Sequence, residues 1–197
     1  TEAEERETVV AISELIEYYK GIFTTLSSCA SRQLEEVTFR RATISVPELM
    51  ATAGKYFRKV YKGNKAHIDF KIQLLEGRIT GDWNQLRFLL ENLIDEACSV
   101  TLDGAVCLSA REDGEFIRFL FTDMRREKTR EELNQLFYPD LSRMTAGEKG
   151  ELYGTEYLVC KQIIRDHDEF AGRRGCRINA EPGKEGGFTI YFTLPKK

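Results

Sequence analysis

The feature that most constrains the fold of this chain is a pair of alternating segments, AVCLSARED and EFIRFLFTD, that meet at Asp113-Gly114. Apolar and polar residues alternate in both segments, which is the period of a strand that buries one face. Asp-Gly between two such segments is a strong signal for a tight turn, because glycine readily adopts the positive φ angle that the turn needs. The sequence therefore predicts an antiparallel β-hairpin over residues 105–123.

Segments of the same kind and several helical patterns surround this hairpin. Alternation also predicts strands over about residues 43–46, 67–75, 78–82, 175–181 and 188–195. Apolar residues at helical spacing predict helices over about residues 47–61, 83–97, 129–137 and 157–164, the second of them with Asp82 as its N-cap. We therefore expect an α+β fold, a two-layer sandwich in which a mixed, mostly antiparallel sheet of about five strands is covered on one face by helices.

The first part of the chain has a different pattern. Between residues 9 and 37 apolar residues recur in steps of three and four, which predicts a long helix of about 40 Å. Its apolar stripe is broad enough for a helical bundle. We expect two parts, an amphipathic dimerisation-type helix over residues 1–43 and a domain over residues 44–197. A homodimer through residues 9–37 is the preferred partner arrangement; a neighbouring domain, an upstream helix or packing on its own domain are the alternatives.

Composition excludes several classes of protein. A chain of 197 residues with a formal net charge of −3 and interspersed charges does not suit nucleic acid as a partner. Five scattered cysteines without a C-x-x-C pattern are typical of reduced thiols in a cytosolic protein. No apolar run reaches the roughly 20 residues of a membrane span, so we expect no membrane contact within this segment. The expected location is cytoplasmic, either for the whole protein or for the cytoplasmic part of a membrane-anchored one.

Polar residues at two places in the predicted domain suit a ligand. Asp123 ends an apolar strand, and a carboxylate there can accept a hydrogen bond from an exocyclic amine such as that of adenine. Capping of the next turn by Asp123 is the alternative. Asn92 and Glu96 are spaced i,i+4, so their oxygens lie on one side of a helix and could hold Mg²⁺. A solvated helix face is the alternative for this pair.

The stretch after the predicted helix at 129–137 is polar and contains several glycines. YPDLSRMTAGEKGELYG has little periodicity, so we expect a mobile loop over residues 138–153. Gly147, Gly150 and Gly154 precede the last predicted helix, where backbone N–H groups and the helix dipole favour phosphate. No G-K-[ST] follows them, so this segment is not a P-loop.

Four motifs occur in the order typical of one protein family. GDWNQLRFLLENLIDEA resembles D-x-x-x-L-x-x-x-L-x-N-L-x-x-N-A, and FTDMRREKTREELNQLF stands where D-x-G-x-G-I and F-x-x-F stand. YGTEYLVCKQIIRDH resembles G-L-G-L-x-I-x-K-x-I-V-x-x-H, and GGFTIYFTLP resembles G-T-x-F-x-I-x-L-P. Over about residues 44–195 the chain thus resembles the ATP-binding domain of sensor histidine kinases, the GHKL ATPases of bacterial-type two-component systems. The long helix is similar to the second helix of the dimerisation and phosphotransfer hairpin that precedes such domains.

The resemblance implies a GHKL ATPase fold, with ATP and Mg²⁺ as cofactors of a histidine kinase in signal transduction. Asn92 matches the position near the attacking group and Glu96 stands at the family's Mg²⁺ ligand, so both are candidate catalytic residues and Glu96 is the candidate metal ligand. The residues that would bind the nucleotide are Asp123, Asn92, Gly154 and Lys149.

The same resemblance keeps a working kinase as an alternative function. Its γ-phosphoryl group would pass to a histidine on the dimerisation helices, and Arg143, Lys149, Arg173 or Arg174 would contact phosphates. His67 opens a predicted strand and His167 resembles the family's structural histidine after the last helix, so we expect both to be structural. Neither lies on the long helix, so an acceptor histidine lies on an upstream helix or does not exist.

Departures from the family pattern fall on functional positions. Arg125 and Glu127 replace both glycines after Asp123, where the backbone leaves room for the base. Glu156 adds negative charge where the triphosphate would approach. ATP and Mg²⁺ binding is therefore expected to be weak or lost, as in a pseudokinase, with a response regulator or partner kinase as its partner. A local Arg125–Glu127 ion pair that serves the loop fits the same expectation. The further alternative is a protein-interaction module without any nucleotide chemistry.

Overall fold

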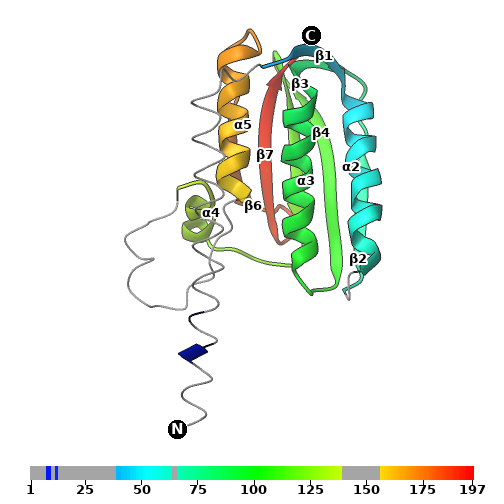
Figure 1. The fold of residues 1–197 in the computed structure, drawn as a ribbon, viewed down its shortest axis with the longest axis vertical. Helices are drawn as coiled ribbons and strands as arrows, with labels where there is room; N and C mark the ends of the chain where they lie inside the picture. The colour runs from blue at the N-terminus through cyan, green and yellow to red at the C-terminus, as the bar shows by residue number, and fades with distance from the viewer. Residues whose placement is uncertain (1–7, 10–11, 13–38, 64–65, 139–155) are drawn as a thin grey trace.

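The computed structural model describes residues 8, 9, 12, 39–63, 66–138 and 156–197 (Figure 1). Its elements in chain order are β1 (Arg41–Ser45), α2 (Val46–Val60), the 3-10 turn η1 (Tyr61–Gly63), β2 (Ile68–Gln73), β3 (Arg78–Asp82), α3 (Trp83–Ser99), β4 (Gly104–Asp113), β5 (Phe116–Asp123), α4 (Arg130–Phe137), α5 (Glu156–Phe170), β6 (Ile178–Pro182) and β7 (Phe188–Pro195). The helix expected over residues 9–37 lies outside the described residues except for Val9 and Ile12, and the loop expected over residues 138–153 does so except for Tyr138.

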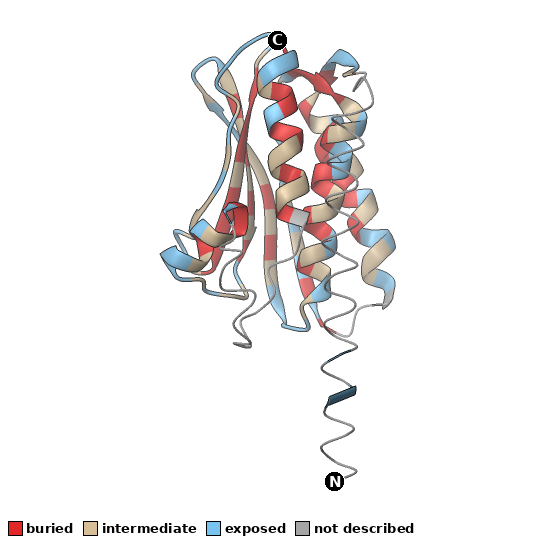
Figure 2. Cartoon of the chain, turned by 60° about the vertical axis from the view of Figure 1, so that its left-hand side comes forward, coloured by how far each residue is buried: buried red, intermediate tan, exposed pale blue. Residues whose placement is uncertain are grey.

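A five-stranded sheet in the order β2-β4-β5-β7-β6 forms one layer. Strands β4, β5, β7 and β6 pair antiparallel, and β2 pairs parallel with β4. Helices α2, α3 and α5 lie together over one face of this sheet (Figure 1). Buried residues lie where the two layers face each other (Figure 2). The expected sandwich, mostly antiparallel and covered on one face, is confirmed.

The central hairpin forms where the sequence predicts it, with its turn after Asp113. Asp113 pairs with Phe116 at the turn and Val106 pairs with Asp123 at the far end. Gly114 has a φ of +60°, which supplies the left-handed conformation that was expected of it. Because the side chains of β5 alternate between buried and half-buried, every second residue of the strand enters the core.

One pairing was not evident from the sequence. β3 pairs antiparallel with β1 in a separate two-stranded sheet, with Ile44 opposite Ile79. Alternation of apolar and polar residues predicts where strands form, but it does not predict which strands pair with each other. The parallel contact of β2 with β4 follows from this arrangement, because the chain passes through β3 and α3 before it returns to the main sheet.

Side-chain caps fix where the helices begin. Ser45 accepts a hydrogen bond from the Glu48 N–H at 3.4 Å, and Asp82 accepts one from the Gln85 N–H at 3.1 Å. Thr129 forms a reciprocal capping box with Glu132 at the start of α4. The predicted N-cap at Asp82 is therefore confirmed, and it sets the phase with which α3 turns its leucines into the core.

His167 joins the end of α5 to the start of α3. Its imidazole is fully buried, and Nε2 accepts a hydrogen bond from the Asp82 N–H at 3.0 Å. Nδ1 therefore carries the proton and donates to the Ile163 carbonyl at 2.7 Å. A Cβ on Gly81 would lie 2.9 Å from Nε2, so glycine is needed there for the ring to fit. These contacts agree with the structural role expected of His167.

Acid is expected to destabilise the fold through His167. Burial lowers the pKa of this imidazole and outweighs the Ile163 hydrogen bond and the charges of Asp82 and Asp166, which raise it. Below the ordinary pKa of 6.5 the unfolded chain therefore binds more protons than the folded one, so stability falls as the pH drops.

Urea unfolding at several pH values between about 7.5 and 5.5 measures this loss. His167→Gln should flatten the pH dependence even though it lowers stability overall. His67→Gln is the matched control, because His67 is exposed. If the two variants show the same pH dependence, the assignment to His167 is wrong.

Candidate functional site

Asp123 is the last residue of β5, and its side chain is only 1% exposed. The turn between β6 and β7 packs against the main chain at this residue. Gly187 has a φ of +69°, and a Cβ at that position would lie 2.0 Å from the main-chain carbonyl oxygen of Asp123. Glycine is therefore needed for this close approach of the turn to the end of β5. A carboxylate buried this deeply requires partners for its charge.

The side chain of Arg125 fills the space in front of this carboxylate. Arg125 Nε donates to Asp123 Oδ1 at 2.9 Å, and Nη2 donates to Oδ2 at 2.8 Å. Although the main chain of Arg125 reaches the surface, its side chain is 0% exposed. The two residues thus form a bidentate, fully buried ion pair, the geometry in which such pairs are strongest.

The remaining N–H groups of this guanidinium point at backbone carbonyls where α3 ends. Nη2 donates to the Ala97 oxygen at 2.7 Å, and Nη1 donates to the oxygens of Leu102 at 3.2 Å and Val100 at 3.4 Å. Together with the two bonds to Asp123, each of the guanidinium's N–H groups has an acceptor. On the stem side, a Cβ on Gly104 would lie 2.9 Å from Arg125 Cγ, so the absence of a side chain there makes room for the arginine.

Arg126 ties Glu96 to the same centre. Its Nη1 and Nη2 donate to the two Glu96 carboxylate oxygens at 3.1 and 2.9 Å, and Nη2 also reaches Asp123 Oδ2 at 3.1 Å. The Asn92 amide turns back along α3 and donates to the Phe88 carbonyl at 2.9 Å. In this arrangement both carboxylate oxygens of Asp123 and both of Glu96 accept hydrogen bonds from arginines.

The ionisation of the cluster follows from these contacts. Burial alone would raise the pKa of Asp123, but hydrogen bonds from Arg125 and the charges of both arginines outweigh it and lower the pKa. Burial would lower the pKa of Arg126, and Glu96 and Asp123 raise it instead. Burial and the Glu96 carboxylate raise the pKa of Tyr157 well above 10.0. Asp123 and Arg126 are therefore charged, and Tyr157 neutral, at neutral pH.

A family profile identifies the scaffold. The profile described as "Histidine kinase-, DNA gyrase B-, and HSP90-like ATPase" matches residues 81–197, more than half of the chain. The chain belongs to this family. Its domain is a histidine-kinase-like ATPase domain of the kind found in signalling proteins.

Individual relatives are similar over most of the chain. The adaptive-response sensory kinase SasA of Thermosynechococcus vestitus is 26% identical over 176 residues, which cover 88% of this chain but only 44% of that kinase. Full-length ShkA in complex with AMPPNP has a TM-score of 0.64 at 16% identity, over 98% of this chain and 40% of ShkA. ThkA in complex with the response regulator TrrA has a TM-score of 0.63 at 17% identity, over 94% of this chain and 52% of that structure's chain. At these identities the structures establish the fold.

Three of the predicted site residues lie together in this ATPase domain. Glu96 of α3 and Asp123 at the end of β5 are joined through Arg126, and Asn92 lies one turn before Glu96 on the same helix. Other predicted residues, namely Arg143, Gly147, Lys149, Gly150 and Gly154, lie outside the described residues. Glu156 is the first residue of α5.

The expectation that Arg173 or Arg174 contacts phosphates is wrong for this arrangement. Both follow the C-terminal end of α5, at the opposite end of the domain from α4 and the last turn of α3 (Figure 1). Arg173 pairs with Glu115 at 2.8 Å and Arg174 pairs with Asp168 at 3.1 Å. The sequence shows two adjacent cations after the last helix, but not that this end of the helix lies far from the last turn of α3.

The proposed Arg125–Glu127 ion pair is also wrong. Glu127 is exposed, and Arg125 turns inward to Asp123. The alternative in which Asp123 caps the next turn describes part of the geometry, since Asp123 Oδ1 accepts a hydrogen bond from the Arg125 N–H at 3.0 Å. Sequence reasoning missed Arg126 altogether. The available signal was a pair of consecutive arginines that begins two residues after a buried acid, because such an acid needs positive partners.

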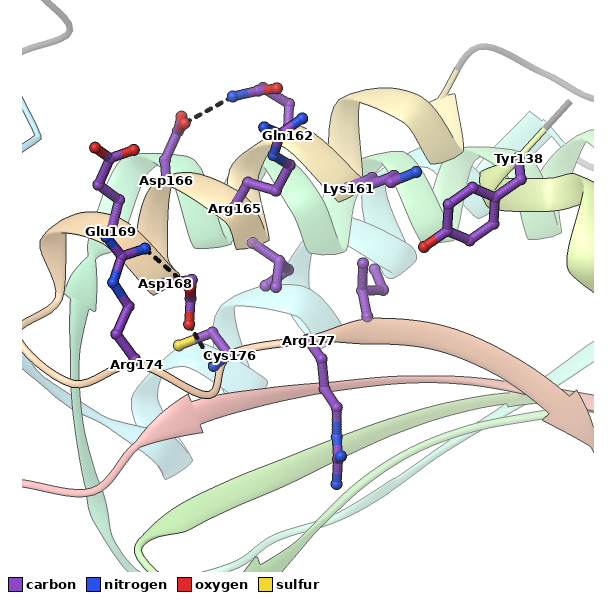
Figure 3. A pocket seen from close by; sticks show the side chains of 12 residues that line it. Tyr138, Lys161, Gln162, Arg165, Asp166, Asp168, Glu169, Arg174, Cys176 and Arg177 are labelled. Atoms are coloured by element: carbon purple, nitrogen blue, oxygen red, sulfur yellow. Dashed lines mark hydrogen bonds and ion pairs between the residues drawn. The ribbon is translucent and has the colours of Figure 1, made fainter.

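A cavity of about 420 Å³ lies apart from this cluster, between α5 and the segment that enters β6 (Figure 3). Several of the polar side chains that line it contact one another. Asp168 pairs with Arg174, Gln162 donates to Asp166 at 2.8 Å, and Lys161 Nζ lies 3.5 Å from the centre of the Tyr138 ring. The cavity contains none of the motif residues Asn92, Glu96 and Asp123. In the described part of the chain, no helix is long and apolar enough to span a membrane.

Removal of the buried negative charge should strongly destabilise the domain. Asp123→Asn leaves the Arg125 guanidinium buried without its counter-charge, for which a loss of about 3 to 5 kcal/mol in the free energy of unfolding is expected. Glu115→Gln removes a charge from an exposed pair with Arg173 and should change it by less than about 1 kcal/mol. Denaturant unfolding of both variants tests the difference. Equal effects would show that the Asp123–Arg125 pair has no special weight.

Proposed function

We propose that this protein is a pseudokinase of two-component-type signalling, in which binding of ATP and Mg²⁺ is weak or lost. The observation that supports this proposal best is the Arg125 side chain, which is 0% exposed and engages both oxygens of the Asp123 carboxylate. Asp123 is the position that the family uses for adenine. In this chain that position already has an intramolecular partner.

On the adenine side, a nucleotide would have to displace Arg125. Adenine would offer Asp123 one neutral hydrogen bond, typically about 0.5 to 1.5 kcal/mol, in place of two charge-assisted ones of about 1.5 to 3 kcal/mol each. Breaking a buried ion pair by removing one partner typically costs about 3 to 5 kcal/mol in total. Since micromolar affinity corresponds to about 8 kcal/mol, this displacement would use a large share of it.

On the metal side, Arg126 occupies the carboxylate that would bind Mg²⁺. Both Glu96 oxygens accept hydrogen bonds from Arg126, and Arg126 also contacts Asp123. Mg²⁺ binds through carboxylate oxygens, water and phosphate oxygens, so it would have to displace one cation while another stays close by. Arg125 therefore hinders binding of the adenine base, and Arg126 hinders binding of the Mg²⁺ ion.

The function left to such a domain is a structural one in signalling. We expect it to form a homodimer through residues 9–37 and to contact a response regulator or a partner kinase in the cytoplasm, or on the cytoplasmic side of a membrane. Val9 and Ile12 are 62% and 51% exposed, as expected of a stripe that a second chain covers. The solved complex of ThkA with the response regulator TrrA gives an example of such a contact in a protein of the same fold.

Calorimetric titration tests the loss of nucleotide binding. Mg-ATP, Mg-ADP and metal-free ATP should each give no saturable heat with the native chain, because Arg125 and Arg126 hold Asp123 and Glu96. A micromolar dissociation constant for Mg-ATP that Asn92→Ala or Asp123→Asn abolishes would refute the proposal. The working kinase, which passes the γ-phosphoryl group to a histidine, would then replace it.

Light scattering tests the dimer. Val9→Glu with Ile12→Glu should convert a dimer into a monomer, because charges in the apolar stripe would be buried without partners. Leu74→Glu is the matched control, since Leu74 is 62% exposed but belongs to the ATPase domain, and this variant should stay dimeric. A native chain that is monomeric at tens of micromolar would exclude the dimer.

A further inference from the structure

We infer that the pocket at Asp123 is a guanidinium-binding site, and that Arg125 is its built-in ligand. The inference rests on the proposed function to the extent that no nucleotide competes for the pocket. It goes further, because it assigns a chemical class of ligand to the pocket. The assignment comes from the lining, the charge and the shape of the pocket.

The lining consists of hydrogen-bond acceptors. Besides the Asp123 carboxylate, the carbonyls of Ala97, Val100 and Leu102 point at the bound group. A guanidinium offers donors in a planar fork and no acceptor, so each of its N–H groups finds an oxygen here. Adenine offers one amino group, while its ring nitrogens are acceptors that would face these oxygens without a donor.

The charge of the pocket also selects a cation. Asp123 is 1% exposed and ionised, because hydrogen bonds and charges from the arginines stabilise its carboxylate. A neutral base in place of Arg125 would leave much of this charge without compensation. The last carbonyls of α3 add a second negative feature, since the C-terminal end of a helix carries unpaired oxygens and the negative end of the helix dipole.

The backbone is shaped around the arginine stem. Gly104 has a φ of +134° and has no Cβ that would collide with Arg125 Cγ. Gly104 N donates to the His67 carbonyl at 3.0 Å, which holds this approach in place. The site is therefore built from α3, the start of β4 and the end of β5, three elements of the rigid domain.

Chemical rescue of the full chain carrying Arg125→Ala tests the inference. The variant should melt below the native protein, and guanidinium or methylguanidinium at millimolar concentration should raise its melting temperature by several degrees. At that concentration the denaturing effect of guanidinium is negligible. Native protein should not respond. Urea, which is planar but neutral, sodium chloride of equal ionic strength and adenosine should not rescue the variant.

Two further variants keep the test decisive if Arg125→Ala does not fold. Arg125→Lys retains the charge and should also gain stability from guanidinium, but less, because the lysine competes for Asp123. Asp123→Asn combined with Arg125→Leu removes both charges and should fold without any response to guanidinium. For Arg125→Ala, the yield of refolding with guanidinium relative to urea then replaces the melting temperature.

The outcomes separate this inference from the proposed function. If adenosine or Mg-ATP stabilises Arg125→Ala more than guanidinium does, the pocket is still an adenine site and the inference is overturned. An equal response to guanidinium in the doubly neutral variant, or no response to any probe in Arg125→Ala, also overturns it. Binding of Mg-ATP by the native chain overturns the proposed function instead, whatever the variants do.

Discussion

The need to pair one buried carboxylate organises the functional end of this domain. Asp123 leaves the core at the end of β5 with almost no exposure, and a charge in that position is tolerated only with a partner. Arg125 supplies that partner and in doing so reaches the end of α3, while Arg126 extends the network to Glu96. Helix α3, the central hairpin and the loop after it are therefore held together by charge as well as by apolar packing.

Much of the fold could be predicted from the sequence because it depends on local patterns. Alternation marked the hairpin that turns at Gly114, and the leucines of α3 together with Asp82 marked a helix and its start. The pairing of β1 with β3 could not be read in this way, since any half-buried strand shows the same alternation. Which strands become neighbours is decided by the packing of the whole domain.

The site was predictable in its position but not in its contents. The motifs predict that Asn92, Glu96 and Asp123 lie near one another, and the structure joins Glu96 to Asp123 through Arg126, with Asn92 one helical turn before Glu96. Sequence reasoning treated Arg125 as a lost glycine that crowds the base. The sequence did not show that the Arg125 guanidinium donates hydrogen bonds to Asp123, because the direction of a long side chain cannot be inferred from its neighbours in sequence. For the same reason sequence reasoning missed Arg126 and predicted phosphate contacts for Arg173 and Arg174, which pair with Glu115 and Asp168.

The contacts of Arg125 also bear on the order in which the domain assembles. Its partners at Ala97, Val100, Leu102 and Asp123 lie at most 28 residues away in the chain, whereas the bond between His167 and Asp82 spans 85 residues. Closing a short loop loses less conformational entropy than closing a long one, and contacts that are near in sequence favour rapid folding. In the segment from α3 to the loop after β5, Arg125 can therefore fill the Asp123 pocket before α5 docks. The folding chain then need not form an intermediate in which this pocket is empty.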